Sequence, residues 1–81
     1  MYDFWLPKET VQMLKETYKP GDIVELIYMD DKFSPPEGTR GIVKYIDDGG
    51  TIHVNWNGYG SLGLIYGIDK FKIIKEEKDG P

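Results

Sequence analysis

The sequence has no cysteine and a single histidine among its 81 residues. Without cysteine the chain can form neither a disulfide nor a thiolate zinc site, and it must fold by packing alone. The lack of disulfides fits a reducing compartment, so we expect a cytoplasmic protein. No serine or cysteine occupies the strand-turn-helix position of a catalytic nucleophile. The sequence therefore favours a protein that is not an enzyme and that needs no cofactor and no metal.

Long apolar stretches and excess positive charge are absent as well. No apolar run approaches the roughly 20 residues that span a bilayer, and the opening segment MYDFWLPKET lacks the basic and apolar regions of a signal peptide. The formal net charge is -4, which is the wrong sign for binding a nucleic-acid backbone. We therefore expect a protein or peptide partner, with nucleic acid disfavoured and no membrane involved.

Apolar residues recur with helical spacing near the start of the chain. In PKETVQMLKETY, Val11, Leu14 and Tyr18 fall on one face of an amphipathic helix, predicted over about 7–18 with a proline at its first position. Pro20 and the glycine after it end the helix. An isolated helix of this length is marginal in water, so we expect it to dock on the segments that follow.

From Gly21 onward apolar residues alternate with polar ones, which is typical of half-buried strands. The alternation predicts five strands, in the segments DIVELIYM, GIVKYID, TIHVNW, LGLIY and FKII. The sequence DDGG between the second and the third segment predicts a tight hairpin turn. In the first strand, Val24, Leu26 and Tyr28 are predicted on one face and Met29 on the other.

Five short strands with a long polar first connection predict a mainly β fold. We expect a small five-stranded SH3-like antiparallel barrel with one N-terminal amphipathic α-helix, because closing the sheet removes the edges that invite aggregation. A chain of this length has room for one domain. We therefore assign residues 1–81 to a single domain, with the barrel over about 21–75 and a charged tail at 76–81.

The order of short motifs resembles a known family. The chain has PG, VEL and MDD before a Pro-Pro loop that ends in GTRG. After the loop come a hairpin with DD, the segment VNW, a glycine-rich segment with leucine, and GID. This pattern resembles the small bacterial and phage family catalogued as domain of unknown function 4314, and LPKETVQMLKETY is similar to that family's N-terminal helix. The resemblance covers nearly the whole chain. The matching residues are Pro20, Gly21, Val24 to Leu26, Met29 to Asp31, Pro35, Pro36, Gly38 to Gly41, Val43, Asp47, Asp48, Gly50, Val54, Trp56, Gly58, Leu62, Gly67 and Asp69.

The resemblance supports the predicted fold and implies an accessory protein of bacteria, phages or other mobile elements, but it implies no activity. One residue departs from the family pattern, because Asn57 stands where the family more often has an acidic residue. More loosely, the layout G-x-x-V, G-T-x-G-x-V and V-x-W is similar to peptide-binding SH3-like modules in ubiquitin ligases of the mind-bomb type.

The segment GYGSLG, Gly58 to Gly63, has the GxGxxG spacing of phosphate-binding loops. Such a loop needs a helix that begins inside the motif, so that the first N–H groups of the helix meet the phosphates. The residues that follow the motif, LIY, are typical of a strand instead. We therefore interpret Gly58 and Gly60 as turn residues and expect Tyr59, between them, to be exposed.

Paired aspartates occur at Asp30–Asp31 and at Asp47–Asp48, without the spacing of a calcium loop. Aspartate favours turns because its side chain accepts hydrogen bonds from nearby backbone N–H groups, so we interpret both pairs as turn caps. Arg40 is a candidate ion-pair partner of one of these aspartates. His53 alternates with apolar residues in the third strand, and we expect it to face solvent or to support a turn.

The chain carries many large aromatic side chains for so small a barrel, so some of them must be exposed. SH3-like barrels bind extended peptides in an aromatic groove beside the long first loop, where acidic residues select basic partners. By analogy, the candidate binding residues are Asp30, Asp31, Phe33, Trp56 and Tyr59. An alternative role for the tryptophan is a place in the core, since it lies in phase with Ile52 and Val54.

Two alternatives to a peptide-binding module stay open. SH3-like barrels also bind nucleic acid, which requires basic residues to gather on one face beside exposed rings; here these are Lys32, Arg40, Lys44, Lys70 and Lys72. The second alternative is an acidic inhibitor, in which exposed Asp and Glu side chains occupy the basic groove of a host protein.

Overall fold

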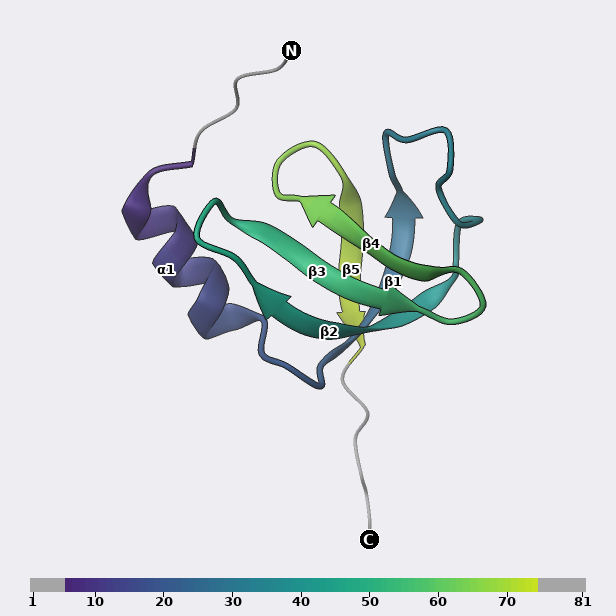
Figure 1. The fold of residues 1–81 in the computed structure, drawn as a ribbon, viewed down its shortest axis with the longest axis horizontal. Coiled ribbons are helices and arrows are strands. Elements are labelled where there is room, and N and C mark those ends of the chain that lie inside the picture. Colours follow the sequence, from purple (N-terminus) through teal and green to yellow (C-terminus); the bar gives the residue numbers. More distant parts are fainter. Residues whose placement is uncertain (1–5, 75–81) are drawn as a thin grey trace, which may run out of the picture.

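The computed structural model describes residues 6–74 and consists of one helix followed by five strands (Figure 1). The elements are α1 (Lys8–Thr17), β1 (Ile23–Tyr28), β2 (Arg40–Ile46), β3 (Thr51–Trp56), β4 (Gly60–Ile65) and β5 (Lys70–Ile74). The predicted mainly β fold, with five antiparallel strands and one N-terminal helix, is confirmed. The charged tail predicted at 76–81 lies outside the described residues.

The five strands form one sheet in the order β4-β3-β2-β1-β5, and all neighbouring strands are antiparallel. The sheet bends strongly around the core, so that β1 and β5 run across β3 and β4 in Figure 1. The two edge strands, β4 and β5, are not paired with each other, and the sheet is therefore open. The closed SH3-like barrel that we predict from the sequence is not established by this topology.

Helix α1 begins one residue later than predicted, because Pro7 has extended backbone (φ -60°, ψ 152°) and serves as the N-cap. Val11 and Leu14 are buried, as their spacing predicts. Tyr18, the C-cap, packs its ring against that of Phe71 on β5 at a centroid distance of 5.3 Å. Burial of the Tyr18 hydroxyl, with Tyr66 nearby, raises the pKa of that side chain. The helix therefore docks on the sheet by its predicted apolar face.

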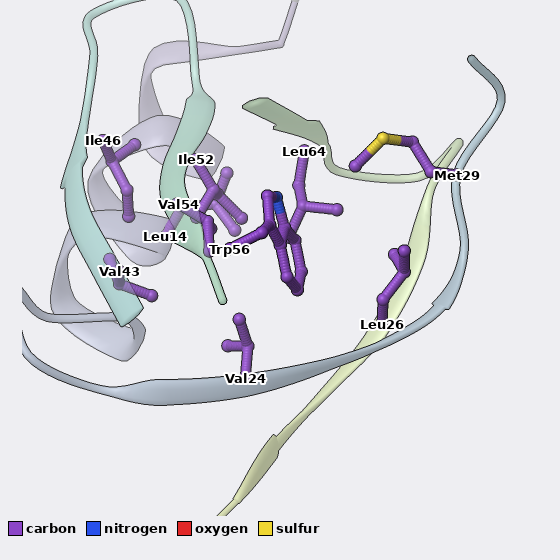
Figure 2. Packing of buried hydrophobic residues seen from close by; sticks show 10 residues of the cluster. All are labelled: Leu14, Val24, Leu26, Met29, Val43, Ile46, Ile52, Val54, Trp56 and Leu64. Carbon is purple, nitrogen blue, oxygen red and sulfur yellow. The ribbon is translucent and has the colours of Figure 1, made fainter. Parts of the chain in front are cut away.

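The core lies between α1 and the concave face of the sheet (Figure 2). Its members come from the helix and from four strands or their ends: Leu14, Val24, Leu26, Met29, Val43, Ile46, Ile52, Val54, Trp56 and Leu64. Trp56 is the largest of the fully buried side chains and lies at the centre of this group in Figure 2. Gly41 on the neighbouring strand makes room for the indole, since a Cβ there would lie 2.8 Å from Trp56 Cε3.

A β-bulge in β1 overturns the predicted orientation of two residues. Leu26 pairs with Phe71 but Tyr28 pairs with Lys70, so that Ile27 is an extra residue in β1. An extra residue reverses the alternation of side chains beyond it. Tyr28, predicted on the core face, is therefore 54% exposed, and Met29, predicted on the other face, is only 6% exposed.

A second bulge lies in β2. Val43 pairs with Val54 and Tyr45 with His53, which leaves Lys44 as the extra residue. Val43 and Ile46 therefore both enter the core, while Tyr45 lies on the outer face of the sheet.

Candidate functional site

The DDGG turn between β2 and β3 is organised by one carboxylate. Asp47 Oδ1 accepts hydrogen bonds from the backbone N–H groups of Gly49 (3.0 Å) and Thr51 (2.9 Å), and its Oδ2 lies 2.9 Å from His53 Nε2. The His53 ring in turn stacks on Tyr45, with centroids 4.4 Å apart and planes 10° from parallel. Asp47 thus caps the turn and His53 supports it, as predicted, whereas Asp48, also predicted to cap the turn, pairs with Lys15 instead.

These contacts set the ionisation of Asp47. Partial burial alone would raise the pKa of its carboxyl group, but the hydrogen bonds from His53 and from the N–H groups of Thr51 and Gly49 outweigh burial and lower the pKa. A pKa that is lower in the folded state stabilises the fold wherever the carboxylate is charged in both states. That contribution is present above the ordinary pKa of 3.8 and is lost as the pH falls through the lowered value.

We therefore expect Asp47→Asn to destabilise the protein at about pH 6, and the difference from wild type to shrink steadily as the pH falls below about 4. Urea unfolding at a series of pH values measures this difference. The matched control is Asp48→Asn in the same turn, because the Asp48 carboxylate is fully exposed and pairs only with Lys15 at 3.0 Å. A difference between wild type and Asp47→Asn that does not change with pH would contradict the assignment.

The first loop, between β1 and β2, begins with the predicted acidic pair. Asp31 Oδ1 accepts a hydrogen bond from the N–H of Phe33 at 2.8 Å, so Asp31 caps a turn as predicted. The carboxylate of Asp30 is exposed, and no hydrogen bond to it occurs among residues 6–74. Asp30 therefore presents an exposed carboxylate at the base of the loop, without an ion-pair partner in the part of the chain that the structure describes.

Asp69 holds this part of the loop in place, a role that the sequence analysis does not assign to it. Its side chain is buried, Oδ1 accepts the N–H of Asp30 at 2.9 Å, and Oδ2 accepts the N–H of Ile65 at 2.8 Å. The carboxylate thus joins the loop to the end of β4. The only signal in the sequence is the G-x-D motif after a predicted strand, which does not reveal a partner 39 residues away.

A groove of about 470 Å³ opens where the loop meets β4. We call it the acidic groove. Both aspartates of the predicted site line it, and the opposite wall comes from the β4 end and the β4–β5 turn. The lining residues are Met29, Asp30, Asp31, Thr51, Gly63, Ile65, Ile68 and Asp69.

Tyr59 lies in the turn at the other end of β4. Gly58 (φ 84°) and Gly60 (φ 77°) adopt the left-handed conformation that glycine tolerates, and the Tyr59 side chain between them is 53% exposed. The chain continues as strand β4 rather than as a helix. GYGSLG therefore begins in the hairpin turn at residues 57–59 and continues as the first part of β4, and the exposed position predicted for Tyr59 is confirmed.

The structure separates the remaining predicted site residues. Trp56 is only 1% exposed, and its indole Nε1 donates a hydrogen bond to the carbonyl of Leu62 at 3.1 Å, so its assignment to a surface site is wrong. Phe33 is 71% exposed in the first loop, where Lys32 Nζ lies 5.5 Å from the centre of its ring, but it does not line the acidic groove. Asp30 and Asp31 are the two predicted residues that the fold brings to one groove.

Arg40 pairs with Glu25 rather than with an aspartate. Its Nε lies 3.2 Å from Glu25 Oε1, and Lys72 Nζ lies 3.8 Å from Glu25 Oε2. The two strands place these residues opposite each other, because Glu25 is in register with Arg40 on one side and with Lys72 on the other. The pairing suggested from the sequence is therefore wrong, and Arg40 does not pair with the aspartates of the acidic groove.

Within the described segment, no three acidic or histidine side chains are grouped so as to hold a metal ion. Helix α1, the one helix between residues 6 and 74, is not long and apolar enough to cross a membrane.

Together these features define a small, mainly β protein with one open antiparallel sheet and with exposed aromatic and acidic side chains on its connections. The chain belongs to the family described as Domain of unknown function (DUF4314), whose model matches residues 7–74. Searches of curated proteins and of solved structures found no match.

Proposed function

We propose that the protein is a non-catalytic binding module that recognises an extended, basic peptide segment of a partner protein. The observation that carries the proposal is the acidic groove, in which the exposed Asp30 and the turn-capping Asp31 face the end of β4. In this proposal the protein acts in the cytoplasm as an accessory protein of a bacterium, a phage or another mobile element.

Charge gives the groove its selectivity. Asp30 and Asp31 have no ion-pair partner among residues 6–74, whereas Asp47, Asp48 and Glu25 each have one. A Lys or Arg of the partner therefore gains two unneutralised carboxylates, and an acidic partner is repelled. An open groove of this size suits a short segment of chain better than a large folded surface.

The proposal is tested by panning a library of random peptides displayed on phage against the folded protein. We expect enrichment of peptides with a Lys or Arg beside residues that favour strands, and direct binding of the enriched peptides in fluorescence anisotropy. Asp30→Asn/Asp31→Asn removes both charges but keeps an amide oxygen that can cap the turn. This double variant is expected to bind at least about tenfold more weakly.

Asp48→Asn is the matched control, because it removes one exposed aspartate that does not line the groove, and it is expected to bind like wild type. The proposal fails if no peptide is enriched, or if the double variant binds within twofold of wild type.

A second candidate, nucleic-acid binding, is favoured by one observation on the outer face of the sheet. Four of the five basic residues required for it extend from this face, and Tyr28 and Tyr45 are exposed beside them. These are Arg40, Lys44, Lys70 and Lys72, whereas Lys32 lies in the first loop. Glu25 pairs with two of the four, which weakens the patch.

The same anisotropy assay with a labelled single-stranded oligonucleotide tests this candidate. If the protein binds nucleic acid, its affinity for the oligonucleotide falls steeply as the salt concentration rises. Lys44→Ala and Lys70→Ala then each lower that affinity. Binding that is unaffected by salt, or no binding at all, contradicts it.

A further inference from the structure

The direction of the backbone groups on β4 follows from the hydrogen bonds of β3. The carbonyl of Thr51 accepts the N–H of Asp47, and the N–H of Asn57, directly after β3, donates to the carbonyl of Arg40, so both ends of β3 point these backbone groups at β2. Backbone groups alternate along an antiparallel strand. Ile52, Val54 and Trp56 therefore point theirs at β4.

On β4, the partners of those three residues are Leu64, Leu62 and Gly60, which use their N–H and C=O groups in the ladder with β3. Ser61 and Gly63 lie between them and so direct their own N–H and C=O groups away from the sheet. No hydrogen bond to these four groups occurs among the described residues. β4 thus presents an unpaired edge over Ser61–Gly63.

The edge ends at a defined point. Ile65 also points its backbone groups outward, but Asp69 Oδ2 accepts its N–H and the N–H groups of Ile68 and Asp69 donate to its carbonyl. The open part of the edge therefore runs from the turn that carries Tyr59 to the acidic groove at Gly63. Ser61 is exposed and Gly63 is half-buried, so the backbone here is accessible.

The two edges of the sheet differ in protection. β5 carries Lys70 and Lys72, and charged side chains of this kind discourage pairing with another chain. β4, with the sequence GSLGLI, carries no charge. A second strand can therefore pair with the β4 edge without the free-energy cost of covering or displacing charged side chains.

Building on the proposed function, we infer that the basic peptide binds by adding a strand to β4, pairing with the backbone of Ser61 and Gly63 while its Lys or Arg lies against Asp30 and Asp31. The open edge over Ser61–Gly63 spans about 10 Å, at about 3.4 Å per residue, so about three peptide residues pair with it, and the peptide extends past both ends toward Tyr59 and the acidic groove. Strand-favouring residues fit beside Ser61, and the exposed ring of Tyr59 contacts the far end of the peptide.

The probe for this inference is the tightest peptide from the phage panning, synthesised as a series in which one backbone nitrogen at a time is methylated. Strand addition requires the N–H of every second peptide residue. We expect methylation to weaken binding at least about tenfold at alternate positions of the paired segment and to leave the positions between them within about twofold.

A protein variant gives a second measurement. Ser61→Pro removes the outward N–H of β4 but no bond to β3, a position where strands tolerate proline, and it is expected to lose at least about tenfold in affinity. Ser61→Ala is the matched control, since both variants lose the hydroxyl that accepts Lys44 Nζ at 3.2 Å but alanine keeps the N–H. Ser61→Ala is expected to bind like wild type.

The outcomes separate the two proposals. Peptide binding without a period-two methylation pattern overturns strand addition but leaves the binding module standing. A wild-type dimer in analytical ultracentrifugation that dissociates in Ser61→Pro overturns the peptide as the occupant and assigns the edge to a second copy. Enrichment of no peptide overturns both the proposed function and this inference. If Ser61→Pro does not fold, the methylated peptides decide the question alone.

Discussion

Replacing Trp56 with alanine is expected to lower the free energy of unfolding by about 3–5 kcal/mol, the usual cost of deleting a buried aromatic side chain. The indole is almost fully excluded from water, it contacts the strand at Gly41, and its Nε1 satisfies the carbonyl of Leu62. Urea unfolding followed by far-ultraviolet circular dichroism measures the loss, because this signal does not depend on tryptophan.

The total stability of a small domain is of the same order, about 5 kcal/mol, so Trp56→Ala is expected to be largely unfolded at room temperature. Trp56→Phe keeps a ring in the core and gives a measurable intermediate loss. Tyr59→Ala is the matched control, since it removes an exposed aromatic side chain three residues away, and its stability is expected to stay within about 0.5 kcal/mol of wild type. A decrease of less than about 1 kcal/mol in the free energy of unfolding of Trp56→Ala would contradict a core role and favour a surface position for the residue.

The elements of the fold could be predicted because their signals are local. Helical spacing, prolines and glycines at the boundaries, and the DDGG turn each act within a few residues, and the structure contains all the predicted elements. The orientation of Tyr28 and Met29 could not be predicted, because the bulge that reverses them arises from how β1 pairs with β5. That pairing joins residues far apart in the sequence.

The difference between local signals and long-range contacts also explains which features of the candidate site could be predicted. Turn caps at Asp31 and Asp47 and the exposure of Tyr59 follow from local turn chemistry, and the structure shows them. Two other features depend on contacts between residues far apart in the sequence: the pairing of Arg40 with Glu25 across neighbouring strands and the link that Asp69 makes to the first loop. From the sequence, Trp56 could be assigned either to the core or to a surface binding site. Its burial became clear only from the way the bent sheet encloses the indole.

Replacing Asp69 with alanine is expected to lower the free energy of unfolding by about 2–4 kcal/mol, because two backbone N–H groups lose their side-chain acceptor in a buried place. The N–H groups belong to Asp30 and Ile65, which lie on either side of the acidic groove. Asp69→Asn is expected to cost nearly as much, since an amide has one acceptor oxygen and would place its NH₂ group against the second N–H. Urea unfolding measures both losses.

Hydrogen exchange distinguishes this role from a general loss of packing. In Asp69→Asn, hydrogen exchange at the amides of Asp30 and Ile65 is expected to speed up relative to wild type by more than exchange at the core amides of Val24 and Val54. The reason is that the variant removes the hydrogen bonds that protect Asp30 and Ile65. Asp30→Asn is the control, since its side chain is exposed while its N–H still donates to Asp69. Wild-type stability in Asp69→Asn would contradict the link. If the link holds, peptide binding weakens in Asp69→Asn although Asp30 and Asp31 keep their carboxylate side chains, because Asp30 is then no longer fixed opposite β4.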